Sequence, residues 1–151
     1  MIKMGYIPSV LIAEDDRDDR LLMEEGFREN EYTNTLIFVN DGEELIDYLL
    51  RQGNYKLRGE ALPDLIFLDL NLPKKDGREC LKMIKKHPVI KRLPVIVFST
   101  SNSHLDVKEC YELGANCYLS KPQTFKELTE MLRKIGDFWF NNVEYSPKAD
   151  V

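Results

Sequence analysis

Short apolar runs alternate along the chain with segments of helical periodicity. Five such runs lie at residues 10–13, 35–39, 64–69, 94–99 and 117–120. Most are apolar at successive positions rather than at every second one, a pattern typical of strands buried on both faces of a parallel sheet. Helices are predicted after these runs, at residues 17–29, 43–51, 78–86, 105–113 and 125–140. The pattern therefore predicts an α/β fold built from a repeated βα unit.

The last predicted helix has the clearest apolar stripe. Its apolar residues recur at spacings of three and four, as in an amphipathic helix: Phe125, Leu128, Met131, Leu132, Ile135, Phe138 and Trp139. Gly114 is predicted to cap the preceding helix in a left-handed conformation, and Gly77 to form a tight turn with positive φ. The polar segment 52–63 is predicted to be a surface loop.

Composition narrows the class of protein. The chain has 151 residues, of which 43% are hydrophobic, enough for one domain with its own core. We expect this domain at residues 1–140, followed by a short tail at 141–151. The formal charge of −5 argues against a nucleic-acid partner. The three cysteines lack CxxC spacing and predict reduced thiols. No apolar run suits a signal peptide or a membrane span, so a cytoplasmic location is expected.

Reactive side chains follow the predicted strands. In parallel α/β sheets, ligands bind at the carboxyl ends of the strands. The residues found there are Glu14, Asp15 and Asp16 after the first strand, Asp69 at the end of the third, Ser99 and Thr100 at the fourth, and Lys121 after the fifth. Each alone has a simpler explanation: the acids open a helix, Asp69 caps a turn, and Lys121 is a surface lysine. The fold, however, places them all at one edge of the sheet.

Carboxylates packed this closely require a cation. A pair of like charges at 4 Å costs on the order of 4 kcal/mol at an effective dielectric near 20. Ligand sets made only of oxygen favour Mg²⁺. Asp15 and Asp69 are predicted as direct ligands, and Glu14 as a ligand through water. A phosphoryl group is then able to approach Asp69, the predicted nucleophile, while Lys121 and the Ser99 hydroxyl hold its oxygens.

Segments 10–16, 69–77, 94–100 and 114–122 resemble the response-regulator receiver domains of two-component signalling, over roughly residues 8–135. The resemblance implies a flavodoxin-like, five-stranded parallel sheet in the order 2-1-3-4-5, with helices on both faces. The site residues that it implies are the acidic pair Glu14 and Asp15, the phosphoacceptor Asp69, the metal-binding carbonyl of Asn71, the switch hydroxyl of Ser99, Lys121, the rotating aromatic Tyr118, and a cis bond between Lys121 and Pro122.

The function implied by the resemblance is that of a single-domain response regulator. Asp69 would accept a phosphoryl group from a histidine kinase or a histidine phosphotransfer protein, and the protein would switch its protein–protein interactions. Its only catalysis would be its own phosphorylation and dephosphorylation. The chain is most similar to stand-alone receivers that partner with phytochrome-type kinases. This implies a homodimer through the fourth helix, fifth strand and fifth helix, with Trp139 and Phe140 as surface candidates unless Trp139 continues the core stripe.

Two other classes use a similar sheet. Phosphatases of the haloacid dehalogenase type have an aspartate nucleophile, but they need a second acid two residues later, where this chain has Asn71. A flavodoxin-like electron carrier needs hydroxyls and glycines in its first loop, whereas Glu14, Asp15 and Asp16 would repel a flavin phosphate.

Overall fold

The computed structural model describes residues 6–148, which contain one parallel sheet of five strands. The strands are β1 (Val10–Ala13), β2 (Leu36–Val39), β3 (Leu65–Leu68), β4 (Val95–Ser99) and β5 (Cys117–Ser120). They lie in the order β2-β1-β3-β4-β5, and every neighbouring pair is parallel. The predicted strand number and order are confirmed.

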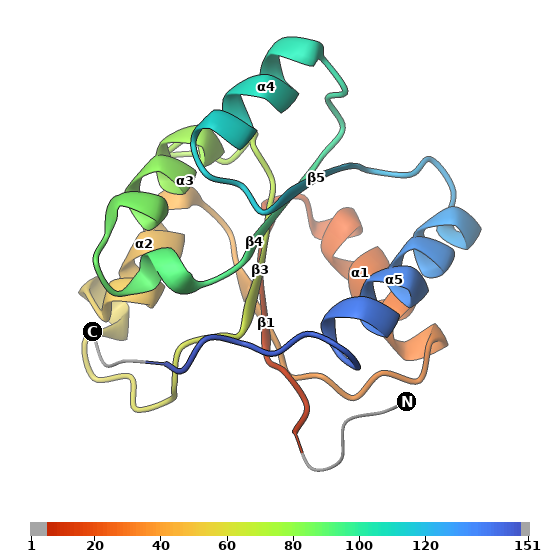
Figure 1. Cartoon of the computed structure of the whole chain (residues 1–151), viewed down its shortest axis with the longest axis horizontal. Helices are drawn as coiled ribbons and strands as arrows, with labels where there is room; N and C mark the ends of the chain where they lie inside the picture. Colours follow the sequence, from red (N-terminus) through yellow and green to blue (C-terminus); the bar gives the residue numbers. More distant parts are fainter. Residues whose placement is uncertain (1–5, 149–151) are drawn as a thin grey trace.

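Helices cover both faces of the sheet. They are α1 (Arg17–Glu29), α2 (Gly42–Leu50), α3 (Gly77–Lys86), α4 (His104–Glu112) and α5 (Phe125–Trp139), with two short 3-10 helices, η1 (Gly53–Tyr55) and η2 (Ile90–Arg92). Figure 1 shows α1 and α5 on one side of the strands and α2, α3 and α4 on the other. The ends of the five α-helices and five strands fall within one residue of the predicted ends.

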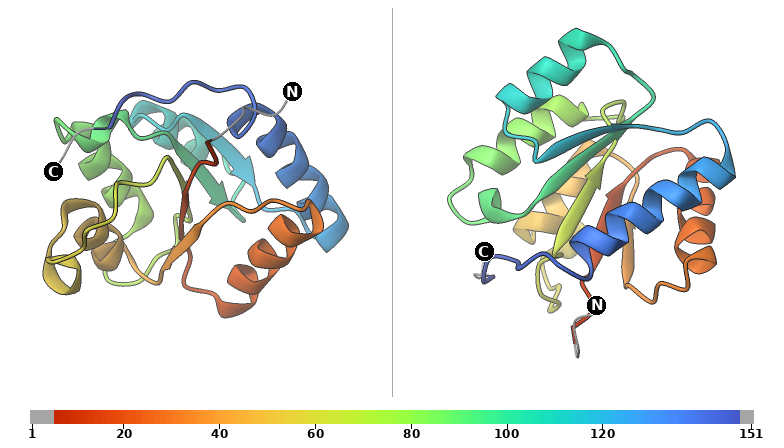
Figure 2. Two further views of the ribbon diagram at one scale, coloured as in Figure 1. Left: turned by 90° about the horizontal axis from the view of Figure 1, so that it is seen from below. Right: turned by 45° about the vertical axis from the view of Figure 1, so that its right-hand side comes forward.

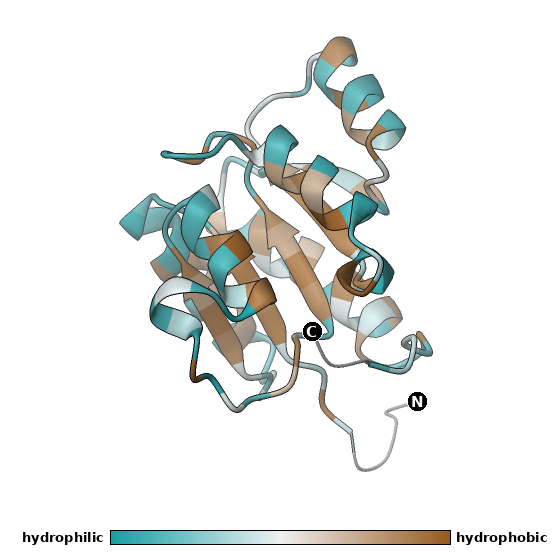
Figure 3. Ribbon diagram, turned by 90° about the vertical axis from the view of Figure 1, so that its left-hand side faces the viewer, coloured by the Kyte–Doolittle hydropathy of each residue, from teal (hydrophilic) through white to brown (hydrophobic). Residues whose placement is uncertain are grey.

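The sheet separates two apolar cores. One contains Leu11 and Ile66 and faces α2 and α3, whereas the other contains Ile12 and Phe67 and faces α1 and α5. β1, β3 and β4 are buried at every position, as expected, and the edge strands β2 and β5 are partly exposed. Hydropathy follows the same division, with apolar strands and polar outer faces of the helices (Figure 3).

The two glycine predictions have different outcomes. Gly114 has a φ of +105°, which confirms the left-handed cap after α4. The prediction for Gly77 is wrong, because this residue is the first of α3 and does not have positive φ. A Cβ at Gly77 would lie 2.6 Å from the Cα of Leu70. Gly77 therefore allows α3 to start directly against the loop that follows β3.

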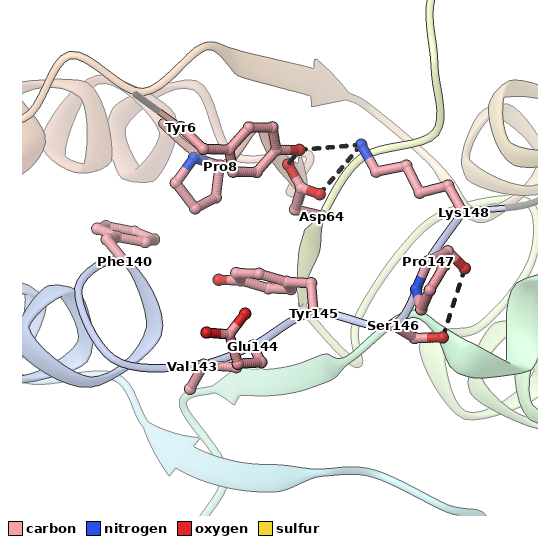
Figure 4. A pocket seen from close by; sticks show the side chains of 10 residues that line it. All are labelled: Tyr6, Pro8, Asp64, Phe140, Val143, Glu144, Tyr145, Ser146, Pro147 and Lys148. Carbon is pink, nitrogen blue, oxygen red and sulfur yellow. Dashed lines mark hydrogen bonds and ion pairs between the residues drawn. The ribbon is translucent and has the colours of Figure 1, made fainter. Parts of the chain in front are cut away.

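The segment after α5 packs against the amino-terminal edge of the sheet. It leaves the layer of α1 and α5 and passes beneath the strands toward the layer of α2 and α3 (Figures 1 and 2). Lys148 Nζ lies 3.0 Å from Oδ1 of Asp64, which is buried. Asp64 also accepts hydrogen bonds from the Tyr6 hydroxyl at 2.6 Å and the Ser9 N–H at 2.9 Å. Figure 4 shows the side chains of Tyr6 and Lys148 converging on Asp64. This ion pair therefore ties residue 148 to the start of β3.

Residues 149–151 of the predicted tail lie outside the described residues. Between residues 6 and 148, no helix is both long and apolar enough to cross a membrane.

Candidate functional site

Strand register brings the predicted acids together at the carboxyl edge of the sheet. Ala13 pairs with Leu68, so that Glu14 and Asp69, the next residues, emerge side by side. The Asp69 N–H donates to the Ala13 carbonyl at 3.1 Å, which extends the pairing of β1 and β3 by one residue. Glu14, Asp15 and Asp69 each offer a carboxylate oxygen, and these oxygens all lie within 4.8 Å of one another.

Lys121 reaches this acidic cluster from the end of β5. Its Nζ donates to Glu14 Oε1 at 2.5 Å and to Asp69 Oδ2 at 3.0 Å. It also donates to Asp19 Oδ2 at 3.0 Å. The Lys121 side chain is only 11% exposed. Asp19 was not among the predicted site residues, although its place in the first turn of α1, three residues after the N-cap Asp16, indicates that it lies near the end of β1.

The prediction of a cis bond between Lys121 and Pro122 is wrong, because residues 6–148 contain no cis peptide bond. The trans form is intrinsically favoured even before proline. Lys121 makes its contacts in this form: its backbone N–H donates to the Ser99 carbonyl at 2.7 Å while its ammonium group reaches the acids.

The acidic run at residues 14–19 has two roles. Asp16 caps α1, because its side chain accepts a hydrogen bond from the Asp19 N–H at 3.0 Å. The Asp16 N–H in turn donates to Glu14 Oε2 at 3.1 Å. The simple explanation as a helix-opening charge run therefore holds for Asp16, whereas Glu14 and Asp15 belong to the cluster at the strand ends.

Burial and charge perturb two groups of the cluster. Burial, and then the negative charge of Asp69, raises the pKa of Glu14 to about 7, although Lys121 opposes the increase. Burial alone would lower the pKa of Lys121, but its bonds to Glu14 and Asp69 outweigh this effect and raise the pKa. Glu14, Asp19 and Asp69 share this one ammonium group, and Asp15 lies beside Glu14 and Asp69, so the cluster has a surplus of negative charge.

Asp69 is held in one orientation. It is 7% exposed, and it follows the last residue of β3. Lys121 binds Oδ2, and the Asn71 N–H donates to Oδ1 at 3.1 Å. Both carboxylate oxygens are therefore fixed by donors, which leaves their remaining lone pairs for a cation or an electrophile.

Ser99 and Tyr118 are joined through Ser101, which the sequence analysis did not identify. Ser99 is fully buried, and its Oγ accepts a hydrogen bond from the Ser101 N–H at 3.2 Å. Tyr118 packs against the core, and its hydroxyl donates to the Ser101 carbonyl at 2.7 Å. Thr100, between the two serines, is exposed. No sequence motif marks Ser101, since its partners lie on different elements.

A family model described as the response regulator receiver domain matches residues 10–133. The chain belongs to this family. Response regulator Rcp1 of Synechocystis sp. is 42% identical over 134 residues, which cover 89% of this chain and 90% of Rcp1.

Two solved structures extend the match to three dimensions. The Mn²⁺-bound form of Rcp1 has a TM-score of 0.84 at 41% identity and covers 93% of this receiver domain and 99% of that chain. The phosphorylated cyanobacterial phytochrome response regulator RcpA has a TM-score of 0.87 at 37% identity, covering 94% and 100%. The predicted family and fold are thus confirmed, and neither the phosphatase nor the electron-carrier alternative is supported.

Proposed function

We propose that this receiver domain accepts a phosphoryl group on Asp69 from a phosphohistidine of a histidine kinase or a histidine phosphotransfer protein. The observation that carries the proposal is a buried aspartate at a strand end, bonded to Lys121 and within 4.8 Å of two further carboxylates. A carboxylate oxygen of Asp69 attacks phosphorus, the P–N bond breaks, and the electron pair leaves with the imidazole.

A divalent cation fits the acidic cluster. Its donors are hard carboxylate oxygens in surplus over positive charge, the set that suits Mg²⁺. Asp15 and Asp69 would be direct ligands, Glu14 would act through water, and the backbone carbonyl of Asn71 would complete the set. When bound, the ion neutralises charge on the transferring phosphoryl group. Rcp1 and this chain share the family, and the Rcp1 structure contains Mn²⁺.

The remaining site residues act on the phosphoryl group or report its presence. Lys121, already bonded to Asp69, pairs with a phosphoryl oxygen. The Ser99 hydroxyl donates a hydrogen bond to another phosphoryl oxygen. Ser99 and Tyr118 are both hydrogen-bonded to the backbone of Ser101. Movement of the Ser99 hydroxyl therefore changes the hydrogen bond and the position of the Tyr118 side chain. The phosphorylated state then differs from the resting state on the surface around α4 and β5, which changes partner binding.

Partner surfaces flank the site. Leu21 and Leu22 of α1 and Phe125 of α5 are exposed large apolar residues on helices that begin at the same sheet edge as Asp69. This position suits a helical phosphohistidine donor, and a phytochrome-type sensor kinase is the partner class proposed.

The three cysteines are free, as suits a cytoplasmic location.

A homodimer through α4, β5 and α5 is also part of the proposal. Leu105 and Tyr111 of α4 and Phe138 of α5 are exposed, and Trp139 is half-buried against the core. The suggestion that Phe140 takes part is wrong, because Phe140 is 8% exposed and packs against Phe27. Light scattering of the phosphorylated and unphosphorylated protein measures this association directly.

Mass spectrometry tests the proposal. Incubation with Mg²⁺ and acetyl phosphate should add one phosphoryl group to the protein, and Asp69→Asn should remove this reaction. Asp18→Asn, which removes an exposed carboxylate of the same acidic run, should keep it. An Asp69→Asn protein that still gains the phosphoryl group at another residue would refute the assignment of Asp69. Release of phosphate over many turnovers from phosphomonoesters would contradict the regulatory role.

A further inference from the structure

A chain of polar contacts leads away from Ser99 to two helices. The Ser101 Oγ donates to Asp106 Oδ2 at 2.6 Å, and Asp106 Oδ1 accepts a hydrogen bond from the Arg78 guanidinium group at 2.6 Å. Asp106 lies in the first turn of α4, and Arg78 in the first turn of α3. Together the three residues Ser101, Asp106 and Arg78 form a hydrogen-bonded chain that we call the polar latch.

Every polar group of Ser101 is used. Its N–H donates to Ser99 Oγ, its carbonyl accepts from the Tyr118 hydroxyl, and its Oγ donates to Asp106 while accepting from the Ser103 N–H at 3.3 Å. A serine hydroxyl has one proton and two lone pairs. Because the Ser101 N–H occupies a lone pair of Ser99 Oγ, it limits the directions in which the Ser99 proton can point.

The conformation of Asp106 does not follow from helix capping. Ser103 caps α4 by accepting a hydrogen bond from the Asp106 N–H at 3.3 Å. In a reciprocal capping box, the acid at this position returns its side chain to the backbone N–H of the cap residue. Here the Ser103 N–H binds Ser101 instead, and the Asp106 carboxylate turns to Ser101 and Arg78. Asp106 therefore joins two segments rather than closing its own helix.

Apolar burial anchors α4 only weakly. Cys110 is the one residue of α4 that is buried, and the helix projects beyond the others in Figure 1. An element with so little apolar burial has low local stability. Bonds from Ser101 and Arg78 lower the pKa of Asp106, so that it stays ionised and able to hold both partners.

We infer that Arg78 and Asp106 are positioning residues that act through Ser101 to orient the Ser99 hydroxyl toward the phosphoryl site and to hold Tyr118 and α4 in place. The kinetic part of this inference rests on the proposed function, since it requires that Asp69 accept a phosphoryl group. The part that concerns Tyr118 and α4 does not, because the contacts exist in the unphosphorylated protein.

Three variants and one control test the polar latch. Ser101→Ala removes the hydroxyl, and Asp106→Asn and Arg78→Gln remove the charges. Glu109→Gln is the matched control, since Glu109 lies on the same helix, 3.7 Å from Arg78, and does not contact Ser101 in the described structure. Two quantities are measured: the rate of phosphorylation against acetyl phosphate concentration, and the ¹⁹F NMR signal of Tyr118 in fluorotyrosine-labelled protein, assigned with Tyr118→Phe.

Each latch variant should lower the maximal phosphorylation rate roughly three- to tenfold, the factor that corresponds to the net contribution of one typical hydrogen bond. The half-saturating acetyl phosphate concentration and the affinity for Mg²⁺ should not change, because the acidic cluster is intact. The Tyr118 signal should move in the resting protein. Glu109→Gln should change neither quantity. Ser101→Ala combined with Asp106→Asn should have little more effect than either alone.

The inference is overturned if the latch variants keep the wild-type rate and the wild-type Tyr118 signal. It is also overturned if they only unfold at lower urea concentration, which would make the contacts purely structural. If the wild-type protein takes no phosphoryl group, the proposed function fails, and the polar latch is then judged by the Tyr118 signal alone.

Discussion

Lys121 is the group whose removal tests the electrostatics of the site most directly. Its ammonium group lies between Glu14 and Asp69, whose side chains are 5% and 9% exposed, at 2.5 and 3.0 Å. Lys121→Met keeps the length of the side chain and removes the charge. The two buried carboxylates then repel each other without a shared counter-charge.

The size of the effect follows from burial. Removing one partner of a buried ion pair costs about 3 kcal/mol or more, because the other charge stays buried. In EDTA at pH 8, the free energy of unfolding of Lys121→Met should therefore fall by roughly 3 kcal/mol. Proton uptake by the carboxylates relieves the repulsion, so the loss should shrink toward pH 5. Mg²⁺ should restore more stability to the variant than to the wild type, since it replaces the missing charge.

Urea unfolding followed by circular dichroism measures these values, with an unchanged m-value as the check that only stability has changed. The matched control is Lys108→Met, whose side chain is 73% exposed and whose partner Glu112 lies 3.9 Å away. An exposed pair of this kind is worth about 0.5 kcal/mol or less. The reasoning is refuted if Lys121→Met unfolds in EDTA at the same urea concentration as the wild type.

Three further predictions concern stability. The pKa of Glu14 is raised from 4.5 to about 7. The contribution of Glu14 to the free energy of unfolding is therefore fully present below pH 4.5 and is lost as the pH rises to 7. In EDTA, the free energy of unfolding of the wild-type protein should fall by about 3 kcal/mol across this interval, at 1.36 kcal/mol per pH unit, and Glu14→Gln should abolish this fall. A variant with the same pH profile as the wild type would contradict the raised pKa of Glu14. Gly77→Ala should lower the free energy of unfolding in urea by about 1 to 3 kcal/mol, because the new methyl group meets the backbone of Leu70. A variant as stable as the wild type would show that the loop after β3 moves to accommodate the methyl group without cost. Lys148→Met should lower the free energy of unfolding by about 1 kcal/mol, because it leaves the buried Asp64 without its cation. A midpoint of urea unfolding equal to that of Lys108→Met would mean that this ion pair does not contribute to stability.

The elements were predictable because each has a local cause. The strands are short apolar runs that are buried wherever the sheet is covered on both faces, and helix ends coincide with capping residues such as Asp16 and Thr124. The acidic cluster was also predictable, since parallel strands in this order bring Glu14 and Asp69 to the same edge. For these features the sequence pattern and the rules of strand packing suffice.

The remaining features depend on contacts between residues far apart in the chain. Position 77 requires glycine because the backbone of Leu70 lies against it, and Phe140 is buried because it packs against Phe27 and Tyr32. Neither cause can be read from local periodicity. The trans bond before Pro122 likewise differs from the prediction based on family resemblance.

The amino-acid sequence by itself determined the sheet, its helices and the acids at its carboxyl edge, because apolar periodicity and strand ends are local properties of the chain. Only the tertiary structure decided that Lys121 also holds Asp19, and that Ser101 joins Ser99 to Asp106. Those contacts depend on the direction of single side chains after packing. A hydrogen bond is a matter of a few tenths of an ångström, and sequence spacing does not specify positions that finely.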